Sequence, residues 1–255
     1  YRRFGSLARQ SLEALTAISA QAADDAQRLT ALGARNVRVT GNVKFDIAPP
    51  EAMLTLGRQW RSACGEARPV LLLASTRDGE EALILERLRD VDIPGLLTVV
   101  VPRHPQRFEE VAQLVTKHGF RLQRRSENAR VALETPVFLG DSMGEMFAYY
   151  AACDVAFVGG SLLPYGAQNL IEACAAGKPV LIGPSSFNFT EAAEGAVAAG
   201  AAIRVADAAA LIREAERLLR DRAARERMSR AGLAFCALHR GATARVVDLV
   251  ELRSS

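Results

Sequence analysis

The chain has 255 residues, of which 49% are hydrophobic and 24% charged, so it can bury the core of one or two globular domains. A formal net charge of +3 and a pI near 8.8 permit attraction to anionic substrates. Lys and Arg do not cluster with interleaved aromatics, so a nucleic-acid partner is not expected. No apolar run is long enough to span a membrane, and no signal peptide is expected in these residues.

The four cysteines are far apart in the sequence and form no CxxC pair. This spacing argues against a zinc site or a disulfide framework and favours free thiols in a reducing compartment. No metal and no cofactor are expected. The sequence contains no Walker A run, no HExxH and no GxSxG element, and the missing GxGxxG fingerprint argues against NAD or FAD.

The opening segment predicts two αβ units. Its expected elements are a helix over Phe4–Glu13, a strand over Ala14–Ser19, a helix over Ala22–Leu32 and a strand over Asn36–Thr40. Pro49-Pro50 then interrupts helix and sheet alike. We therefore expect a domain boundary here, with residues 1–46 as the end of one domain and 47–255 as a second. The chain begins at Tyr1 within a helical pattern and without Met, which suggests a piece of a longer protein.

Beyond the boundary, apolar strands alternate with amphipathic helices. The expected strands are Pro69–Ser75, Gly95–Val101, Val137–Leu139, Val155–Val158, Pro179–Ile182 and Ala201–Val205. The expected helices are Asp78–Asp90, Pro105–Lys117, Met143–Ala152, Asn188–Ala199 and a helical tail from Ala208 to Leu252. Continuous apolar strands are typical of parallel sheets covered on both faces. We therefore expect an α/β fold with a Rossmann-like, doubly wound parallel sheet, which binds its ligand at the carboxyl ends of the strands.

The strongest binding signal follows the strand at Val155–Val158. Gly159-Gly160-Ser161 lets the backbone approach a ligand without a Cβ in the way. Asn169 stands where a helix N-cap is expected, and the free amides of Leu170 and Ile171 would attract phosphate. Glu172 can accept hydrogen bonds from sugar hydroxyls. Together these residues predict a nucleotide-sugar site.

Other strand ends add candidates. Pro102-Arg103-His104 offers a guanidinium for phosphate and a possible histidine ligand. Ser75 ends the first strand of the second domain. Either Ser75 or Thr76 caps the next helix, with Glu80 and Glu81 completing a capping box, or a hydroxyl or amide here faces a phosphate.

Met143-Gly144-Glu145 follows the strand at Val137–Leu139. Gly144 in a first helical turn is costly, which a close approach to a flat base would justify. Glu145 could serve a base or ribose, or could favour the helix N-terminus.

These motifs, in this order and spacing, resemble the Kdo (3-deoxy-D-manno-octulosonic acid) transferases of lipopolysaccharide biosynthesis, over nearly the whole chain. The shared stretches are GNVKFD at 41–46, AST and GEE within 74–81, VPRHPQRF at 101–108, GDSMGE at 140–145, DVAFVGGSL at 154–162, NLIEACAAGKPVLIGP at 169–184 and FNF at 187–189. The resemblance implies a GT-B glycosyltransferase, whose C-terminal domain binds CMP-Kdo and whose reaction is inverting and metal-independent. It also implies CMP contacts from Pro102, Arg103, Met143, Gly144, Glu145, Asn169, Leu170, Ile171 and Glu172, with Lys44 and Ser161 near the cleft between the domains.

The same resemblance implies a lipid A precursor (lipid IVA) as acceptor and work at the cytoplasmic face of the bacterial inner membrane. The catalytic general base and the membrane-anchoring segment are expected upstream of this chain, so no catalytic residue is assigned within it. We expect the fragment to bind donor without turning over by itself. Gln168 stands where relatives commonly have His, and Arg77-Asp78 replaces a usual His-Glu pair.

Two other functions stay open. One is a GT-B-like epimerase acting on a UDP sugar, and the other is a non-catalytic nucleotide-binding module. Preference for CMP over UMP and UDP would favour the transferase.

Overall fold

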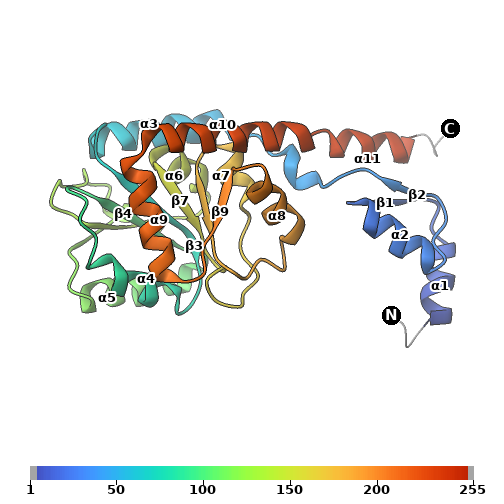
Figure 1. Ribbon diagram of the computed structural model, residues 1–255, viewed down its shortest axis with the longest axis horizontal. Coiled ribbons are helices and arrows are strands. Elements are labelled where there is room, and N and C mark those ends of the chain that lie inside the picture. The colour runs from blue at the N-terminus through green and yellow to red at the C-terminus, as the bar shows by residue number, and fades with distance from the viewer. Residues whose placement is uncertain (1–4, 252–255) are drawn as a thin grey trace. The chain divides into compact units, whose positions relative to one another are not determined.

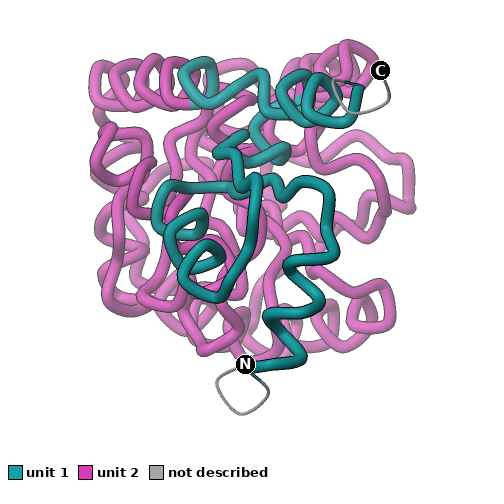
Figure 2. Tube along the Cα trace, turned by 90° about the vertical axis from the view of Figure 1, so that its right-hand side faces the viewer, with its two compact units in different colours: residues 1–47, 236–255 teal, residues 48–235 magenta. Residues whose placement is uncertain are grey.

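The structure is a computed structural model and describes residues 5–251. The chain divides into two compact units, one formed by Tyr1–Ile47 with Cys236–Ser255 and the other by Ala48–Phe235 (Figure 2). The division falls between Ile47 and Ala48, and residues 236–255 group with the first unit; the assignment of 1–46 and 47–255 to two domains of a longer protein stays a prediction. The helix α11 (Ala242–Glu251) explains the grouping. At its start the amides of Gly241 and Thr243 donate to the Asp46 carboxylate, each at 2.5 Å.

The first unit contains two short αβ elements in the predicted order. They are α1 (Gly5–Glu13), β1 (Ile18–Ala20), α2 (Ala23–Ala31) and β2 (Val37–Val39), followed by the 3-10 turn η2 (Val43–Asp46). β1 and β2 pair in parallel. Phe4, where the first helix was expected to begin, lies outside the described residues. The hydrogen bonds of the Asp46 side chain to Thr243 lower the pKa of this carboxyl, so Asp46 caps α11 as an anion.

The second unit is built on one parallel sheet. Within the described residues it has seven strands in the order β5-β6-β4-β3-β7-β8-β9. The strands are β3 (Val70–Thr76), β4 (Leu97–Pro102), β5 (Leu122–Arg124), β6 (Val137–Leu139), β7 (Val155–Val158), β8 (Val180–Ile182) and β9 (Ala202–Arg204). From β3 the chain continues on one side through β4, the edge strand β5 and then β6, which lies between β5 and β4; from β7 it moves outward through β8 and β9 on the other side. The boundary between β3 and β7 is therefore the topological switch point, where such sheets bind ligands. The predicted doubly wound α/β fold is confirmed.

Helices cover both faces of this sheet (Figure 1). They are α3 (Glu51–Cys64), α4 (Glu80–Leu88), α5 (Phe108–Lys117), α6 (Met146–Ala152), α7 (Ile171–Ala175), α8 (Thr190–Ala198), α9 (Ala208–Arg220) and α10 (Arg222–His239). On one face, alternate strand residues such as Leu73, Val100 and Phe157 are fully buried in a core shared with α4, α5 and α9. On the other face, α3 packs against α6.

A glycine sets the approach of α3 to α6. A Cβ on Gly57 would lie 2.4 Å from the carbonyl oxygen of Ala148 and 2.5 Å from Cβ of Ala151. No larger residue fits there without moving the helices apart. α3 was not predicted, because Pro49-Pro50 was interpreted only as a domain boundary.

Other differences concern element ends. β5 was not predicted, and α6 begins at Met146 instead of Met143. The expected helical tail, whose last residue Leu252 lies outside the described residues, is three helices, with Asp221 between α9 and α10. In the described part of the chain, no helix is long and apolar enough to cross a membrane.

Candidate functional site

A cavity of about 370 Å³ lies at the carboxyl ends of the strands in the second unit. The end of β3 and the loops after β4, β6, β7 and β8 all contribute to its wall. Its lining residues are Ser75, Val101, Pro102, Arg103, Ser142, Met143, Gly144, Met146, Tyr149, Tyr150, Gln168, Asn169, Glu172 and Phe189. Seven of the thirteen residues expected at the site lie here: Ser75, Pro102, Arg103, Met143, Gly144, Asn169 and Glu172. The size is within the range of about 300–1,000 Å³ that is typical of small-molecule sites.

Arg103 supplies the positive charge of this wall. Its amide donates to the carbonyl of Thr76 at 3.0 Å, which fixes the backbone at the end of β4 against the end of β3. Its side chain is exposed, and Nε donates to Oε1 of Gln168 at 3.2 Å. Within residues 5–251 its two terminal nitrogens have no acceptor. A guanidinium held at one nitrogen and open at the other two is suited to an anionic oxygen pair.

Asn169 and Glu172 form a second part of the wall. Oδ1 of Asn169 accepts the Ile171 amide at 3.1 Å, and its Nδ2 donates to Oε1 of Glu172 at 3.1 Å. Burial raises the pKa of Glu172, although the Asn169 hydrogen bond and the charge of Arg103 oppose the rise. Glu172 is thus a partly desolvated carboxylate facing an open space.

The expected phosphate contacts through Leu170 and Ile171 need a correction. Both residues are fully buried, and neither lines the cavity. The Ile171 amide is also taken by Asn169. The reason is that α7 begins at Ile171 after Leu170, so Asn169 lies one position earlier than an N-cap and turns its side chain back on the helix start.

The segment from Ser142 to Gly144 forms a third wall. The Ser142 and Tyr149 hydroxyls lie 2.7 Å apart and share a hydrogen bond. Burial raises the pKa of Tyr149, so its phenol stays protonated. Gly144 has φ +79° and precedes α6, and a Cβ there would meet nothing within 4 Å. Glycine is therefore favoured here because the backbone is left-handed. Gly144 lies before the helix, so the expected cost of glycine within a first helical turn does not apply.

The glycine turn after β7 is closed by a glutamate and does not face the cavity. The Glu80 carboxylate accepts the amides of Gly160 at 2.6 Å, Ser161 at 2.9 Å and Leu162 at 2.9 Å. A fourth amide, from Arg77, donates to it at 2.8 Å. Burial raises the pKa of Glu80, and these hydrogen bonds oppose the rise. The turn binds an anion, as its backbone predicts, but that anion is an internal side chain.

Gly159 and Ser161 also have structural roles. A Cβ on Gly159 would lie 2.5 Å from the carbonyl oxygen of Ser75, so glycine allows β7 to pack against β3. The Ser161 side chain is fully buried, where its hydroxyl donates to the Val158 carbonyl at 2.5 Å and accepts the Gly183 amide at 2.8 Å. The expectation that Ser161 faces a ligand is therefore not met by this structure.

Three further predicted residues lie outside the cavity wall. His104 is half-buried next to Arg103, and burial together with the charges of Arg77, Arg103 and Arg107 lowers its pKa. Glu145 pairs with Arg125 at 3.2 Å instead of pointing to a ligand. Lys44 lies in η2 of the first unit, and its place near a cleft stays a prediction.

Sequence reasoning missed the aromatic floor of the cavity. Tyr149, Tyr150 and Phe189 line it, and Tyr149 and Tyr150 are nearly or fully buried. The adjacent pair in α6, one turn after Gly144, was the available signal. The cavity thus combines an exposed cation, a desolvated carboxylate and flat apolar surfaces, which suits a phosphorylated nucleoside. In the described part of the chain, no group of three or more His, Cys, Asp or Glu side chains could hold a metal ion.

Comparison with family models gives two matches. Residues 1–47 match the model for 3-deoxy-D-manno-octulosonic-acid transferase (kdotransferase), and residues 116–234 match the model for glycosyl transferases group 1.

Two relatives carry the name of the first of these families. The 3-deoxy-D-manno-octulosonic acid transferase of Bordetella pertussis is 46% identical over 253 residues, which is 97% of this chain and 59% of the relative. The enzyme of the same name from Haemophilus influenzae is 38% identical over 242 residues, 93% of this chain and 57% of the relative. The chain therefore spans less than two thirds of the length of these relatives.

A solved structure also matches. The crystal structure of the C-terminal CMP-Kdo binding domain of WaaA from Acinetobacter baumannii superposes with a TM-score of 0.69 at 32% identity, covering 73% of this chain and 98% of that domain. Together with the sheet order and the GT-B architecture that these matches support, the comparisons show that this chain belongs to the 3-deoxy-D-manno-octulosonic acid transferase family.

Proposed function

We propose that the second unit binds CMP-Kdo in the carboxyl-edge cavity, as the donor domain of an enzyme that transfers Kdo to a lipid A precursor. The observation that carries the proposal is the convergence of Arg103, Asn169 and Glu172 on one cavity at the switch point of the sheet. The family and the name of the matched Acinetobacter domain support the choice of donor.

Each part of the nucleotide has a proposed partner. The terminal nitrogens of Arg103 bind the phosphate, since they are exposed and have no protein acceptor in the described part of the chain. Glu172, held by Asn169, accepts hydrogen bonds from the ribose hydroxyls. The cytosine lies against Met143 and Gly144. This assignment replaces the buried amides of Leu170 and Ile171 with Arg103 as the principal phosphate contact.

The proposed reaction is an inverting transfer. A hydroxyl oxygen of the acceptor forms a bond to the anomeric carbon of Kdo while the bond from that carbon to the CMP phosphate oxygen breaks. The hydroxyl proton passes to the general base of the complete enzyme, and CMP leaves as an anion. Negative charge grows on the phosphate, so a preorganised donor there lowers the barrier most. Arg103 has this position in our assignment, and its Nε contact with Gln168 holds the guanidinium in place before substrate binds.

The acceptor and the location follow from the family resemblance. We propose lipid IVA as the acceptor and the cytoplasmic face of the inner membrane as the place of action. Lys44 is proposed as a lesser phosphate contact in the complete enzyme.

Calorimetry on the 255-residue chain tests the donor assignment. CMP is expected to bind more tightly than UMP and UDP, because the base contacts would distinguish cytosine from uracil. Tighter binding of UDP would contradict the proposal and favour the epimerase. A nucleotide-binding module would bind CMP equally well but would not gain affinity from the Kdo group, so a non-hydrolysable CMP-Kdo analogue separates that alternative.

A further inference from the structure

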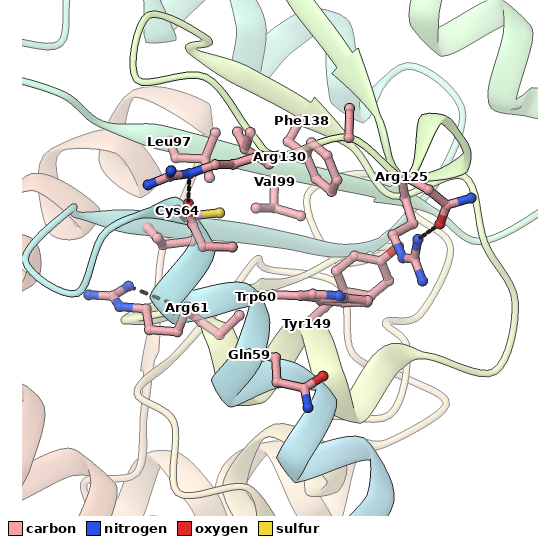
Figure 3. A pocket seen from close by; sticks show the side chains of 16 residues that line it. Gln59, Trp60, Arg61, Cys64, Leu97, Val99, Arg125, Arg130, Phe138 and Tyr149 are labelled. Atoms are coloured by element: carbon pink, nitrogen blue, oxygen red, sulfur yellow. Dashed lines mark hydrogen bonds between the residues drawn. The ribbon is translucent and has the colours of Figure 1, made fainter.

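A second cavity of about 470 Å³ lies on the α3 side of the sheet in the second unit. Figure 3 shows Val99 and Phe138 on one side of it and Trp60 and Tyr149 on the other. Leu97 and Cys64 extend the apolar wall. The opposite face of the sheet is filled by the core with α4, α5 and α9. Protein interiors are normally close-packed, so an apolar space of this size is suited to a ligand's apolar body.

Arginines stand at the ends of this space. Figure 3 places Arg125 at one end and Arg61 and Arg130 at the other. Arg61 is paired with Asp154 at 3.0 Å. Arg125 is paired with Glu145 at 3.2 Å and lies over the Trp60 ring at 4.9 Å.

Arg130 differs from its two neighbours because its charge is not neutralised. Its Nε donates to the Ala63 carbonyl at 3.2 Å, which holds the side chain at the cavity. Its terminal nitrogens have no acceptor among residues 5–251, and the side chain is exposed. In addition, the buried Nε of Arg125 has no hydrogen-bond partner. Oε2 of Glu145, the carboxylate that pairs with Arg125, is buried and unpartnered as well, so this ion pair adds no net charge at the cavity.

We propose that this cavity binds a small amphipathic anion, whose hydrocarbon body lies between Trp60, Val99 and Phe138 and whose anionic head pairs with Arg130. An apolar body fits the walls, and a carboxylate or phosphate head complements a guanidinium that has two free donors. The site is separate from the carboxyl-edge cavity, although Tyr149 lines both. The inference does not depend on the proposed transferase function.

Intrinsic fluorescence gives a direct readout, because Trp60 is the single tryptophan of the 255-residue sequence. The chain is titrated with dodecanoate, dodecyl phosphate and dodecanol, each below its aggregation threshold. We expect a saturable change in Trp60 emission with both anions, and at least tenfold weaker binding of dodecanol, since a hydrogen bond to a charged group is worth about tenfold or more. The ratio of the two anions tells a fatty-acid head from a phosphate head.

Two variants locate the site. Arg130→Gln should weaken dodecanoate binding about tenfold, whereas Arg213→Gln, a matched change at an exposed arginine of α9, should leave it unchanged. Val99→Phe should fill the cavity and abolish binding, with the unfolding midpoint measured in parallel. If Val99→Phe does not fold, Arg130→Gln still decides the question.

Three results would overturn the proposal. They are no saturable change in Trp60 emission, equal affinity for dodecanol and dodecanoate, and an equal loss of affinity in the Arg130 and Arg213 variants. None of them would affect the CMP calorimetry, so failure here and failure of the proposed function can be told apart.

Discussion

Two features at the carboxyl edge of the same sheet are able to bind an anion, and only one is open to a ligand. The turn at Gly160–Leu162 presents three backbone amides, and the Glu80 carboxylate occupies all of them. The cavity beside it presents Arg103, whose terminal nitrogens have no acceptor in the described part of the chain. A glycine turn at a strand end therefore does not by itself mark a phosphate site. What matters is whether the protein already supplies the anion.

The largest expected effect comes from removing the Glu80 carboxylate that the turn at Gly160–Leu162 binds. Glu80→Ala should lower the free energy of unfolding by on the order of 4 kcal/mol, because buried donors left without an acceptor cost about 1–3 kcal/mol each. Urea unfolding followed by circular dichroism measures the loss. Glu86→Ala, at an exposed position of the same helix, is the control and should change stability little. A loss as small as that of the control would mean that Glu80 is not needed by the turn.

Removing the exposed Arg103 guanidinium should weaken CMP binding without changing the free energy of unfolding. Arg103→Ala is expected to weaken CMP by about 2 kcal/mol, roughly thirtyfold, because a charge-assisted contact to phosphate is lost. Its unfolding curve should match the wild type, since the side chain is exposed. Arg87→Ala on α4 is a matched exposed arginine and should keep full CMP affinity. Unchanged CMP affinity in Arg103→Ala would remove this residue from the site.

Substitutions at Gly144 tell whether glycine is needed for its left-handed backbone or for close contact with a base. Gly144→Ala should cost roughly 1–2 kcal/mol of stability, because φ +79° is unfavourable for an L residue. Gly144→Asn should cost less, since Asn tolerates the left-handed region better than Ala does. If glycine is needed for its backbone alone, Gly144→Asn will bind CMP nearly as well as the wild type. A large loss of CMP affinity in that variant, with stability preserved, would instead show that a base packs directly on the glycine.

The smallest effect concerns Glu172 and depends on pH. Burial raises the pKa of Glu172 above its usual 4.5, so the folded state holds this proton more tightly than the unfolded state does. The folded state is therefore penalised increasingly as pH rises above 4.5 and through the folded pKa. Glu172→Gln cannot ionise, so its stability relative to wild type should increase over the same range while CMP binding weakens. Unfolding curves at several pH values test this, and a difference that does not vary with pH would contradict it.

Much of the fold could be predicted from the sequence. The apolar runs around Leu72, Val99 and Phe157 became buried parallel strands, because strands covered on both faces need continuous hydrophobicity. α3 was missed because Pro49-Pro50 suggested a linker, although proline is tolerated just before a helix. β5 was missed because its half-buried residues, Leu122–Arg124, are mostly polar and form the edge of the sheet.

The site was predicted less completely. Arg103 could be found because it directly follows a strand whose end faces the ligand edge, and Asn169 and Glu172 because they lie at the start of the helix that comes after β7. The role of Glu80 could not, because it depends on contact with a turn about eighty positions away. The local sequence around Glu80 fits a capping box equally well, so it does not show that the carboxylate binds the turn after the neighbouring strand β7. The aromatic floor was missed because buried tyrosines in a helix are usually core residues.

The most direct test is a crystal structure of this chain with CMP. Our account predicts the phosphate within hydrogen-bond distance of the Arg103 guanidinium, the ribose beside Glu172, and Glu80 still bound to the amides of Gly160, Ser161 and Leu162. A phosphate seated on those three amides with Glu80 displaced, or CMP bound away from Arg103, would contradict it.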